Sequence, residues 1–208
     1  PRKALTTGEG GAITTDDDKL AALCASLKDH GKNYCCDDGV WSATTSFVRP
    51  GFNYRMSDVL AAIGLAQLPR FDATVKRRQQ LAARYSELFE SEGIESELLR
   101  VPKPPATSFG NHAFQSYVVY LLKAPAGGRD KIIASLKQKG IETQIGTFAV
   151  HLQPAYARKA KTAEKRGVSL RNSELAFRNS LTLPLYSSMT DVEQELVVKE
   201  LIAELKRF

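Results

Sequence analysis

The sequence has few cysteines, no long apolar run and no histidine cluster, and each absence excludes a class of protein. Cysteine occurs three times, as Cys24 and the adjacent pair Cys35 and Cys36. An odd count with an adjacent pair is a poor disulfide framework and indicates a reducing, cytoplasmic setting. No histidine lies at a zinc-like spacing from these cysteines, so we expect no metal site. No stretch approaches the roughly 20 apolar residues of a membrane helix, and we expect no membrane partner.

The charge is positive but dispersed. The formal net charge is +6, with 25% charged and 43% apolar residues, as in an ordinary globular protein. Basic residues gather only in short clusters such as Lys76–Arg78 and Lys159–Lys165. Aromatic residues do not alternate with them as base-stacking platforms would require, so we expect no nucleic-acid partner and a solvated basic face. Phosphate-bearing metabolites remain compatible with this charge.

The chain has 208 residues, enough for one large domain or two small ones. It opens with Pro1 and no methionine, which suggests a piece of a longer protein or a processed one. Residues 10–15 have the composition of a short strand. Thr15 and three aspartates then suit the start of a helix that ends near Gly31. Residues 32–52 are expected to be irregular.

Two further helices are expected between residues 57 and 93. Ser57 and Asp58 form a helix start, followed by a run rich in alanine that allows close packing. Pro69 should break or kink this helix. A charged amphipathic helix then continues to about Gly93, where we place the boundary of a second domain.

The remainder predicts a small α/β domain with antiparallel returns. We expect strands at 117–122, 141–146 and 181–186, and a helix that ends at Gly140. Thr190 and Glu193 form a capping box for the last helix. Its buried stripe is expected to comprise four residues, Val192, Leu196, Leu201 and Leu205.

The opening PRKALTTGEGGAITT places Lys3 just before a turn rich in glycine. Glycines allow positive φ angles and a close approach of the backbone to a ligand. The hydroxyls of Thr6 and Thr7 can bond the nearby backbone or an anion. Glu9 is expected to fix the turn by accepting hydrogen bonds from backbone amides. From spacing alone, Lys3 is one of many lysines, so these residues do not yet assign it a role.

The segment Lys3–Thr15 resembles the cofactor-lysine region of the DegT-type nucleotide-sugar aminotransferases, which use pyridoxal phosphate (PLP). GFNYRMSDVLAAIGLAQL (51–68) and the segment 71–85 are similar to a helix start and a connecting helix of that family. VHLQPAY (150–156) is similar to its substrate-side loop, and LTLPLYSSMT (181–190) to its final strand and helix entry. These matches follow the family's order along the whole chain. The resemblance implies an α/β fold, the C-terminal part of a type I PLP-dependent transferase.

That fold implies three parts: residues 1–55 as the tail of the large PLP-binding domain, 56–92 as connector helices, and 93–208 as the small C-terminal α/β domain. Family members are roughly twice as long, beyond a typical single domain. The part before the lysine carries the aspartate that pairs with the pyridine nitrogen, the ring-stacking aromatic residue and much of the phosphate site. The chain by itself is therefore expected to be catalytically incomplete.

The resemblance also implies roles for individual residues. Lys3 would form the Schiff base with PLP and later move protons at the substrate carbon. Asn53 would reach the cofactor phosphate of the other subunit, and Tyr54 and Arg55 the diphosphate or sugar. His151 would lie near the substrate. The residues themselves also allow an asparagine in a turn before a helix, a structural salt bridge of Arg55 at the dimer interface and a packed loop histidine.

The implied activity is transamination of a nucleotide-diphosphate keto sugar, with glutamate as the amino donor, for a surface polysaccharide or a glycosylated metabolite. A homodimer would share the active site between its subunits. Related dehydratases carry histidine at the lysine position, so Lys3 favours transamination. A PLP-dependent dehydratase, an inactive homologue and a non-catalytic dimerising or regulatory module stay as alternatives.

Overall fold

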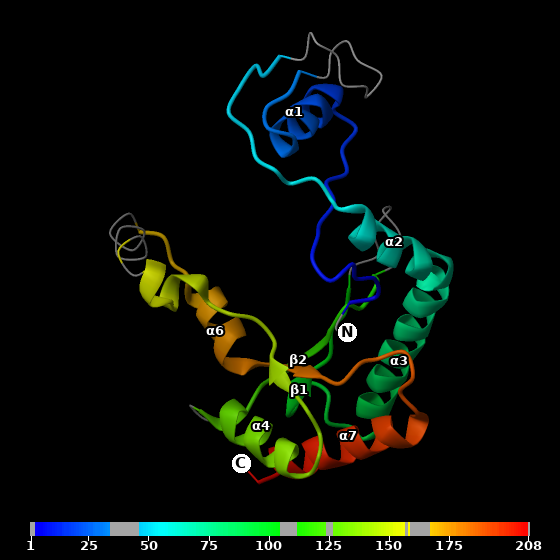
Figure 1. Ribbon diagram of the computed structural model, residues 1–208. Coiled ribbons are helices and arrows are strands. Elements are labelled where there is room, and N and C mark those ends of the chain that lie inside the picture. Colours follow the sequence, from blue (N-terminus) through cyan, green and yellow to red (C-terminus); the bar gives the residue numbers. More distant parts are fainter. Residues whose placement is uncertain are drawn as a thin grey trace. The chain divides into compact units, whose positions relative to one another are not determined.

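The computed structural model describes residues 3–33, 46–104, 112–123, 127–156, 158 and 167–207 (Figure 1). Contacts group the chain into a first unit, Leu5–Phe71, and a second unit, Asp72–Phe208, and Lys3 groups with the second. The pair Cys35 and Cys36 and the whole cluster 159–165 lie outside the described residues. The division into three parts stays a prediction.

The first unit begins with an irregular segment and a helix. Residues 10–15 form no strand, so that prediction was wrong. A strand requires a neighbour that satisfies its backbone groups, and the described residues supply none for this segment. Helix α1 (Asp18–Lys28) follows, and the carboxylate of Asp17 accepts hydrogen bonds from the first-turn amides. The predicted helix is thus confirmed, with Asp17 rather than Thr15 as its cap.

The helices expected after residue 57 are confirmed. Helix α2 (Asp58–Gln67) starts at Ser57, whose hydroxyl accepts a hydrogen bond from the amide of Leu60. Pro69 lies in a short 3₁₀ turn, η1 (Leu68–Arg70), because proline cannot supply the amide that would continue α2. Helix α3 (Phe71–Ser91) then runs to just before Gly93.

The second unit is built on one antiparallel sheet with the strand order β1-β2-β4-β3. The strands are β1 (Leu99–Arg100), β2 (Tyr117–Leu121), β3 (Gln144–Ile145) and β4 (Ser180–Leu183). The central pair aligns Val119 with Leu181. The antiparallel arrangement confirms the prediction, but β3 is shorter than expected. Strand β4 ends before Pro184, which has no amide to donate.

Helices cover both faces of this sheet (Figure 1). Alternate side chains of β2 (Tyr117, Val119 and Leu121) are fully buried in the core, which α4 (Gly128–Gln138) and α7 (Asp191–Leu205) complete. On the opposite face, the hydroxyl of Tyr120 accepts a hydrogen bond from Asn179 of α6 (Arg171–Asn179) at 2.9 Å. The short turns η2 (Val150–Leu152) and η3 (Pro154–Tyr156) precede α6 along the chain.

Helix α7 confirms one prediction and corrects another. The capping box of Thr190 and Glu193 is present, with both reciprocal hydrogen bonds. Val192 and Leu196, however, are 75% and 47% exposed, so the predicted stripe was wrong at these two positions. The buried face instead includes Val197, Val198, Leu201, Ile202 and Leu205. This set follows the i, i+3, i+4 pattern more closely than the widely spaced leucines did.

The cluster Lys76–Arg78 is not the solvated basic face expected from the sequence. Arg78 is 2% exposed and donates hydrogen bonds to the carbonyls of Phe114, at 3.0 Å, and Gln115. Arg77 donates to the carbonyl of Met189 at 2.7 Å. These two arginines therefore tie segments distant in sequence to α3, because a buried guanidinium must bond its N–H groups.

Candidate functional site

Lys3 is exposed and lies in a bend directly before the glycine turn. Gly8 and Gly10 have positive φ angles of 90° and 147°, as the sequence predicted for this turn. The hydroxyl of Thr7 donates to the carbonyl of Glu9 at 2.6 Å, and the amide of Gly8 donates to the hydroxyl of Thr6 at 3.2 Å. The two threonine hydroxyls thus bond the nearby backbone as expected.

Glu9 has a different role from the one predicted. Its carboxylate has no hydrogen bond to the part of the chain that the structure describes, and its side chain is exposed. The turn is held instead through the carbonyl of Glu9, which accepts from Thr7. A threonine hydroxyl two residues earlier reaches that carbonyl within the turn, so the carboxylate is not needed.

The glycine turn lies along one face of α2. Leu60, Gly64 and Gln67 follow the i, i+4, i+7 spacing of a single helical face. A Cβ at Gly64 would lie 3.0 Å from the methyl group of Thr7, and one at Gly8 would lie 3.8 Å from Leu60. The amide oxygen of Gln67 accepts from the backbone N–H of Thr6 at 3.2 Å. Sequence reasoning missed this contact, although the small residues of α2 indicated close packing.

The segment that carries Asn53 and Tyr54 is paired with the end of α1. Asn53 forms an isolated antiparallel bridge with Asp29, and the amide of Tyr54 donates to the carbonyl of Lys28 at 2.8 Å. Phe52 and Tyr54 stack with ring centroids 4.8 Å apart, and Tyr54 is 72% exposed. The pairing with α1 fixes the backbone here, while the side chains of Asn53 and Tyr54 stay exposed.

Arg55 links Asn53 to α1. Its Nε lies 3.4 Å from Oδ1 of Asn53 and 3.4 Å from Oδ1 of Asp29, so one N–H faces two acceptors. This contact uses the amide oxygen of Asn53, which leaves the two N–H groups of its Nδ2 as donors for an anion. Arg55 is therefore paired with Asp29 of the same chain, at the end of α1, and the alternative of a salt bridge at a dimer interface stays a prediction.

His151 lies in the second unit, in η2, and is paired with Glu174 of α6. Its Nε2 is 3.3 Å from Oε1 of Glu174, and only 13% of its side chain is exposed. A carboxylate only accepts hydrogen bonds, so Nε2 carries the proton of this contact and Nδ1 is left to bond a ligand. Glu174 also pairs with Arg178 at 3.3 Å, one turn further along α6. Sequence reasoning found His151 but not its partner, because α6 was not predicted.

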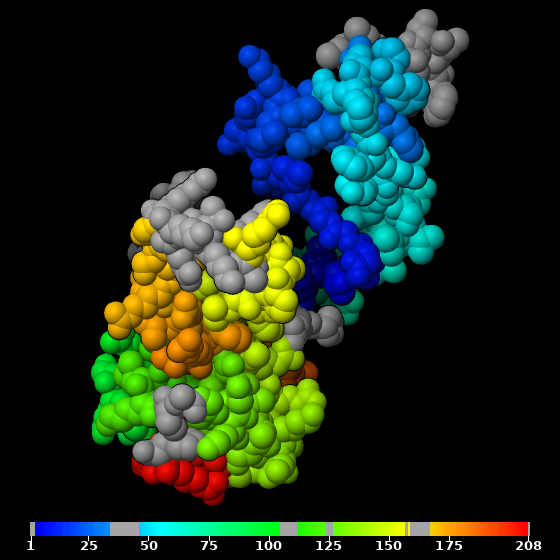
Figure 2. Space-filling view, turned by 90° about the vertical axis from the view of Figure 1, so that its left-hand side faces the viewer, coloured from blue at the N-terminus to red at the C-terminus, as the bar shows by residue number. Residues whose placement is uncertain are grey.

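A second contact joins α6 to the chain before His151. Phe148 and Phe177 stack at 5.9 Å between centroids, and the guanidinium of Arg129 lies 5.2 Å from the ring of Phe177. In Figure 2 the orange α6 lies beside the yellow segment around residues 150–156. The loop with His151 is therefore held by both an aromatic and a polar contact.

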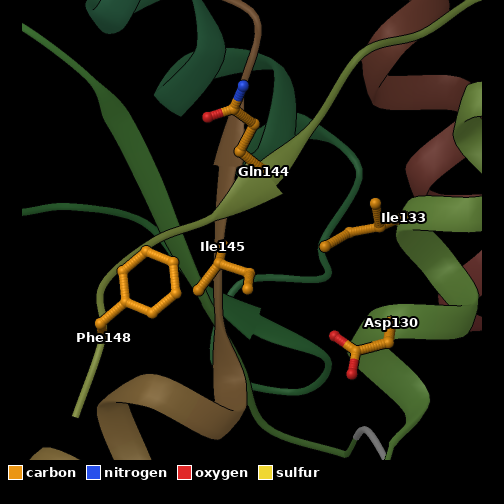
Figure 3. A pocket seen from close by; sticks show the side chains of 5 residues that line it. All are labelled: Asp130, Ile133, Gln144, Ile145 and Phe148. Atoms are coloured by element: carbon orange, nitrogen blue, oxygen red, sulfur yellow. The ribbon is translucent and has the colours of Figure 1, made fainter. Parts of the chain in front are cut away.

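An apolar pocket of about 380 Å³ lies near the start of α4 (Figure 3). Asp130 and Ile133 come from α4, Gln144 and Ile145 from β3, and Phe148 from the following loop. None of the site residues predicted from the sequence lines this pocket. In the described residues we find no group of three or more side chains that could bind a metal ion, and no helix long and apolar enough to span a bilayer.

The predicted site residues are distributed over the two units. Asn53, Tyr54 and Arg55 lie in the first unit, whereas Lys3 and His151 group with the second. The structure brings Asn53 and Arg55 into contact. It thus defines two local arrangements: an exposed amine before a glycine turn, and an exposed amide beside a cation.

Solved structures share this fold. The chain is similar to the aminotransferase TlmJ from Streptoalloteichus hindustanus, with a TM-score of 0.75, 28% identity, and coverage of 99% of this chain and 50% of that one. Its fold also matches PseC from Helicobacter pylori, an aminotransferase of pseudoaminic acid biosynthesis, with a TM-score of 0.79 and 19% identity over 99% and 51% of the two chains. The fold therefore defines the class: the α/β fold of the type I PLP-dependent transferases, as predicted.

Within this class, the chain belongs to the DegT/DnrJ/EryC1/StrS aminotransferase family, whose model matches residues 1–202. The match confirms the family expected from the sequence. Aminotransferases of this family are in general PLP-dependent.

Curated relatives agree. The chain is 35% identical over 203 residues to GDP-perosamine synthase of Caulobacter vibrioides. The aligned region covers 96% of this chain and 49% of that protein. It is 33% identical over 204 residues to the spore coat polysaccharide biosynthesis protein SpsC of Bacillus subtilis, covering 95% and 50%. The chain thus spans about half the length of the curated relatives it matches.

Proposed function

We propose that the whole protein is a PLP-dependent aminotransferase that moves an amino group from glutamate to the keto carbon of a nucleotide-diphosphate sugar. One observation carries this proposal: a lysine directly before the glycine turn, in a chain that matches an aminotransferase family over residues 1–202. Lysine rather than histidine at this position favours transamination over sugar dehydration. The relatives named for perosamine and spore coat polysaccharide support a role in a surface polysaccharide or a glycosylated metabolite, and we expect it to act in the cytoplasm.

The residues present fit the cofactor. PLP offers an aldehyde to an amine and a phosphate to N–H donors, and the chain presents both kinds of group. Lys3 is exposed, and a Cβ at Gly11 would meet no atom within 4 Å, so the backbone of the turn is open to a ligand. The contact with Arg55 uses Oδ1 of Asn53, so the amide N–H groups of Asn53 remain as donors that suit a phosphate oxygen.

Lys3 is the residue that would hold the cofactor, through Nζ. When bound, PLP withdraws electrons from the carbon that carries the amine. In the same site, Nζ of Lys3 would move the proton at that carbon, a role that requires a flexible primary amine within reach. Asn53 would hold the phosphate of the cofactor bound in the partner subunit.

Three further residues would bind the substrate. Tyr54 and Arg55 are exposed beside Asn53, and the guanidinium of Arg55 suits a diphosphate. His151 would bond the sugar through Nδ1, since Nε2 faces Glu174. In the neutral ring Nδ1 accepts a hydrogen bond, and a sugar hydroxyl can donate one.

The active protein would be a homodimer with a shared active site. The first unit exposes several large apolar side chains, among them Val59 at 72%, Leu65 at 66% and Phe47 at 58%. Large exposed apolar side chains support a covering surface, either from the rest of the protein or from a partner subunit. Measurement of the mass in solution by light scattering tests the dimer.

Transfer of ¹⁵N from labelled glutamate to a panel of nucleotide-diphosphate keto sugars tests the activity. The protein at its full natural length should yield a labelled amino sugar, detected by mass spectrometry. Lys3→Ala should lower the rate by at least about a hundredfold, because it removes both the attachment point and the proton carrier. Lys19→Ala, at an exposed lysine of α1, is the matched control and should retain the rate. A Lys3→Ala variant as active as the control would contradict the proposal.

A further inference from the structure

Gln67 makes an unusual contact with the segment that follows Lys3. Its Oε1 accepts a hydrogen bond from the backbone N–H of Thr6 at 3.2 Å, and its Nε2 donates to the carbonyl of the same residue at 2.5 Å. The amide of one side chain therefore bonds both backbone groups of Thr6, as a neighbouring strand would. Sixty-one residues separate the two partners, so the contact is tertiary.

The orientation of Gln67 is itself fixed. Its Nε2 also donates to the carbonyl of Ile63 at 2.9 Å, one turn earlier in α2. With this bond the amide group has three partners, and it is half-buried. The hydrogen bond to Ile63 already fixes the rotamer of Gln67 in the free protein. Gln67 can therefore restrain Thr6 without losing further side-chain entropy when a ligand binds.

The rest of the α2 face supports the same contact. Gly64 lies one turn before Gln67, and a Cβ there would come within 3.0 Å of the methyl group of Thr7. A larger residue at position 64 would therefore move the turn away from Gln67. A Cβ at Gly10, further along the turn, would come within 3.0 Å of Met56, just before α2. The turn is thus in close contact with this face at Thr6, Thr7 and Gly8, and with the residue Met56 before the helix at Gly10.

We propose that Gln67 is a positioning residue for Lys3: it binds the backbone of Thr6 and so fixes the direction in which the chain presents the lysine to the cofactor. Thr6 is three residues after Lys3, so a restraint on the backbone of Thr6 limits the positions that the backbone of Lys3 can reach. The segment belongs to no strand of the described chain, so its restraint depends on such side-chain contacts. The inference rests on the proposed function only in taking Lys3 as the attachment point.

Gln67→Met tests this role, since methionine has a similar shape and helix propensity but cannot form the hydrogen bonds. Gln79→Met is the matched control: Gln79 is also a helical glutamine, and its amide donates to the carbonyl of His112 at 3.1 Å, within the second unit. Both variants are made in the protein at its full natural length. For each, we would measure the amide hydrogen exchange of Thr6 without PLP, the rate at which PLP attaches to Lys3, and the thermal midpoint.

The expected result is specific to Gln67→Met. The exchange of the Thr6 amide should become about tenfold faster, because a hydrogen bond of about 1.4 kcal/mol is lost. Attachment of PLP to Lys3, trapped with borohydride, should slow about fivefold to tenfold, while Gln79→Met leaves both within twofold. If the thermal midpoint shifts by a similar amount in the two variants, the slower attachment in Gln67→Met reflects the positioning of Lys3 and not a general loss of stability.

Three results would overturn the inference. Faster exchange of Thr6 with unchanged attachment at Lys3 would show that Gln67 binds the turn without positioning the lysine, and the proposed function would stand. Unchanged exchange of Thr6 would show that the contact is not formed. If the wild-type protein attaches no PLP at Lys3, the proposed function fails as well, and the exchange measurement still reports on the contact by itself.

Discussion

The close approach of α2 to the glycine turn makes a prediction about Gly64. Glycine in the interior of a helix is about 1 kcal/mol less stable than alanine, and Gly64 is the seventh residue of the ten in α2. On helix propensity alone, Gly64→Ala should therefore stabilise the first unit. The structure predicts that a steric clash between the new Cβ and Thr7 offsets this gain in stability.

The magnitude follows from one distance. A Cβ at Gly64 would lie 3.0 Å from Cγ2 of Thr7, whereas carbon atoms prefer separations of about 3.5–4.0 Å. Overpacking of this kind costs about 1–3 kcal/mol. Set against the helix gain, Gly64→Ala should be between neutral and about 2 kcal/mol less stable than the wild-type protein.

Thr7→Ser isolates the cause, because serine lacks Cγ2 but keeps the hydroxyl that donates to Glu9. In that background Gly64→Ala should stabilise the protein by about 1 kcal/mol, whereas in the wild-type background it should give no gain or a loss. Urea denaturation of the four variants measures the coupling. If Gly64→Ala stabilises the wild-type protein as much as the Thr7→Ser variant, the turn does not lie against α2 and the reasoning is refuted.

Three further predictions follow from the second unit. Tyr85→Phe should cost about 1 kcal/mol in urea denaturation, because the fully buried hydroxyl donates to a backbone carbonyl at 3.0 Å; no loss would contradict this bond. Lys139 donates to Glu204 at 2.6 Å and holds the pKa of Glu204 below 4.5, so this stability is present above about pH 4.5 and lost as the pH falls below it. Lys139→Met should therefore reduce the fall in thermal midpoint between about pH 5 and pH 3, and an unchanged fall would exclude the pair as its cause. Glu174→Ala and His151→Asn should each raise KM for the keto sugar about tenfold, with kcat nearly unchanged. The double variant should have a KM no higher than that of the single variant with the higher KM. If the two increases in KM multiply in the double variant, the two residues act separately.

Local signals in the sequence predicted those elements whose causes are local. The caps at Ser57 and Thr190 and the break at Pro69 depend on hydrogen bonds and ring geometry within a few residues. Each is found where the sequence placed it. The family match confirms the fold class that the sequence motifs predicted.

Errors arose where a distant partner decides the structure. Residues 10–15 have strand composition, but a strand forms only beside another strand. The amphipathic helix α6 was missed, and with it the partner of His151. The contact of Gln67 with Thr6 spans 61 positions, and nothing in the spacing of either residue indicates the other. Sequence patterns thus identified the candidate site residues but not the side chains that hold them.

The most direct test of the account is the identity of the lysine that binds the cofactor. The protein at its full natural length is incubated with PLP, reduced with borohydride and digested, and the modified peptide is found by mass spectrometry. We predict a pyridoxyl group on Lys3 and its absence from Lys3→Arg. An unmodified Lys3, or a modification confined to another lysine, would contradict the assignment of this chain's central residue.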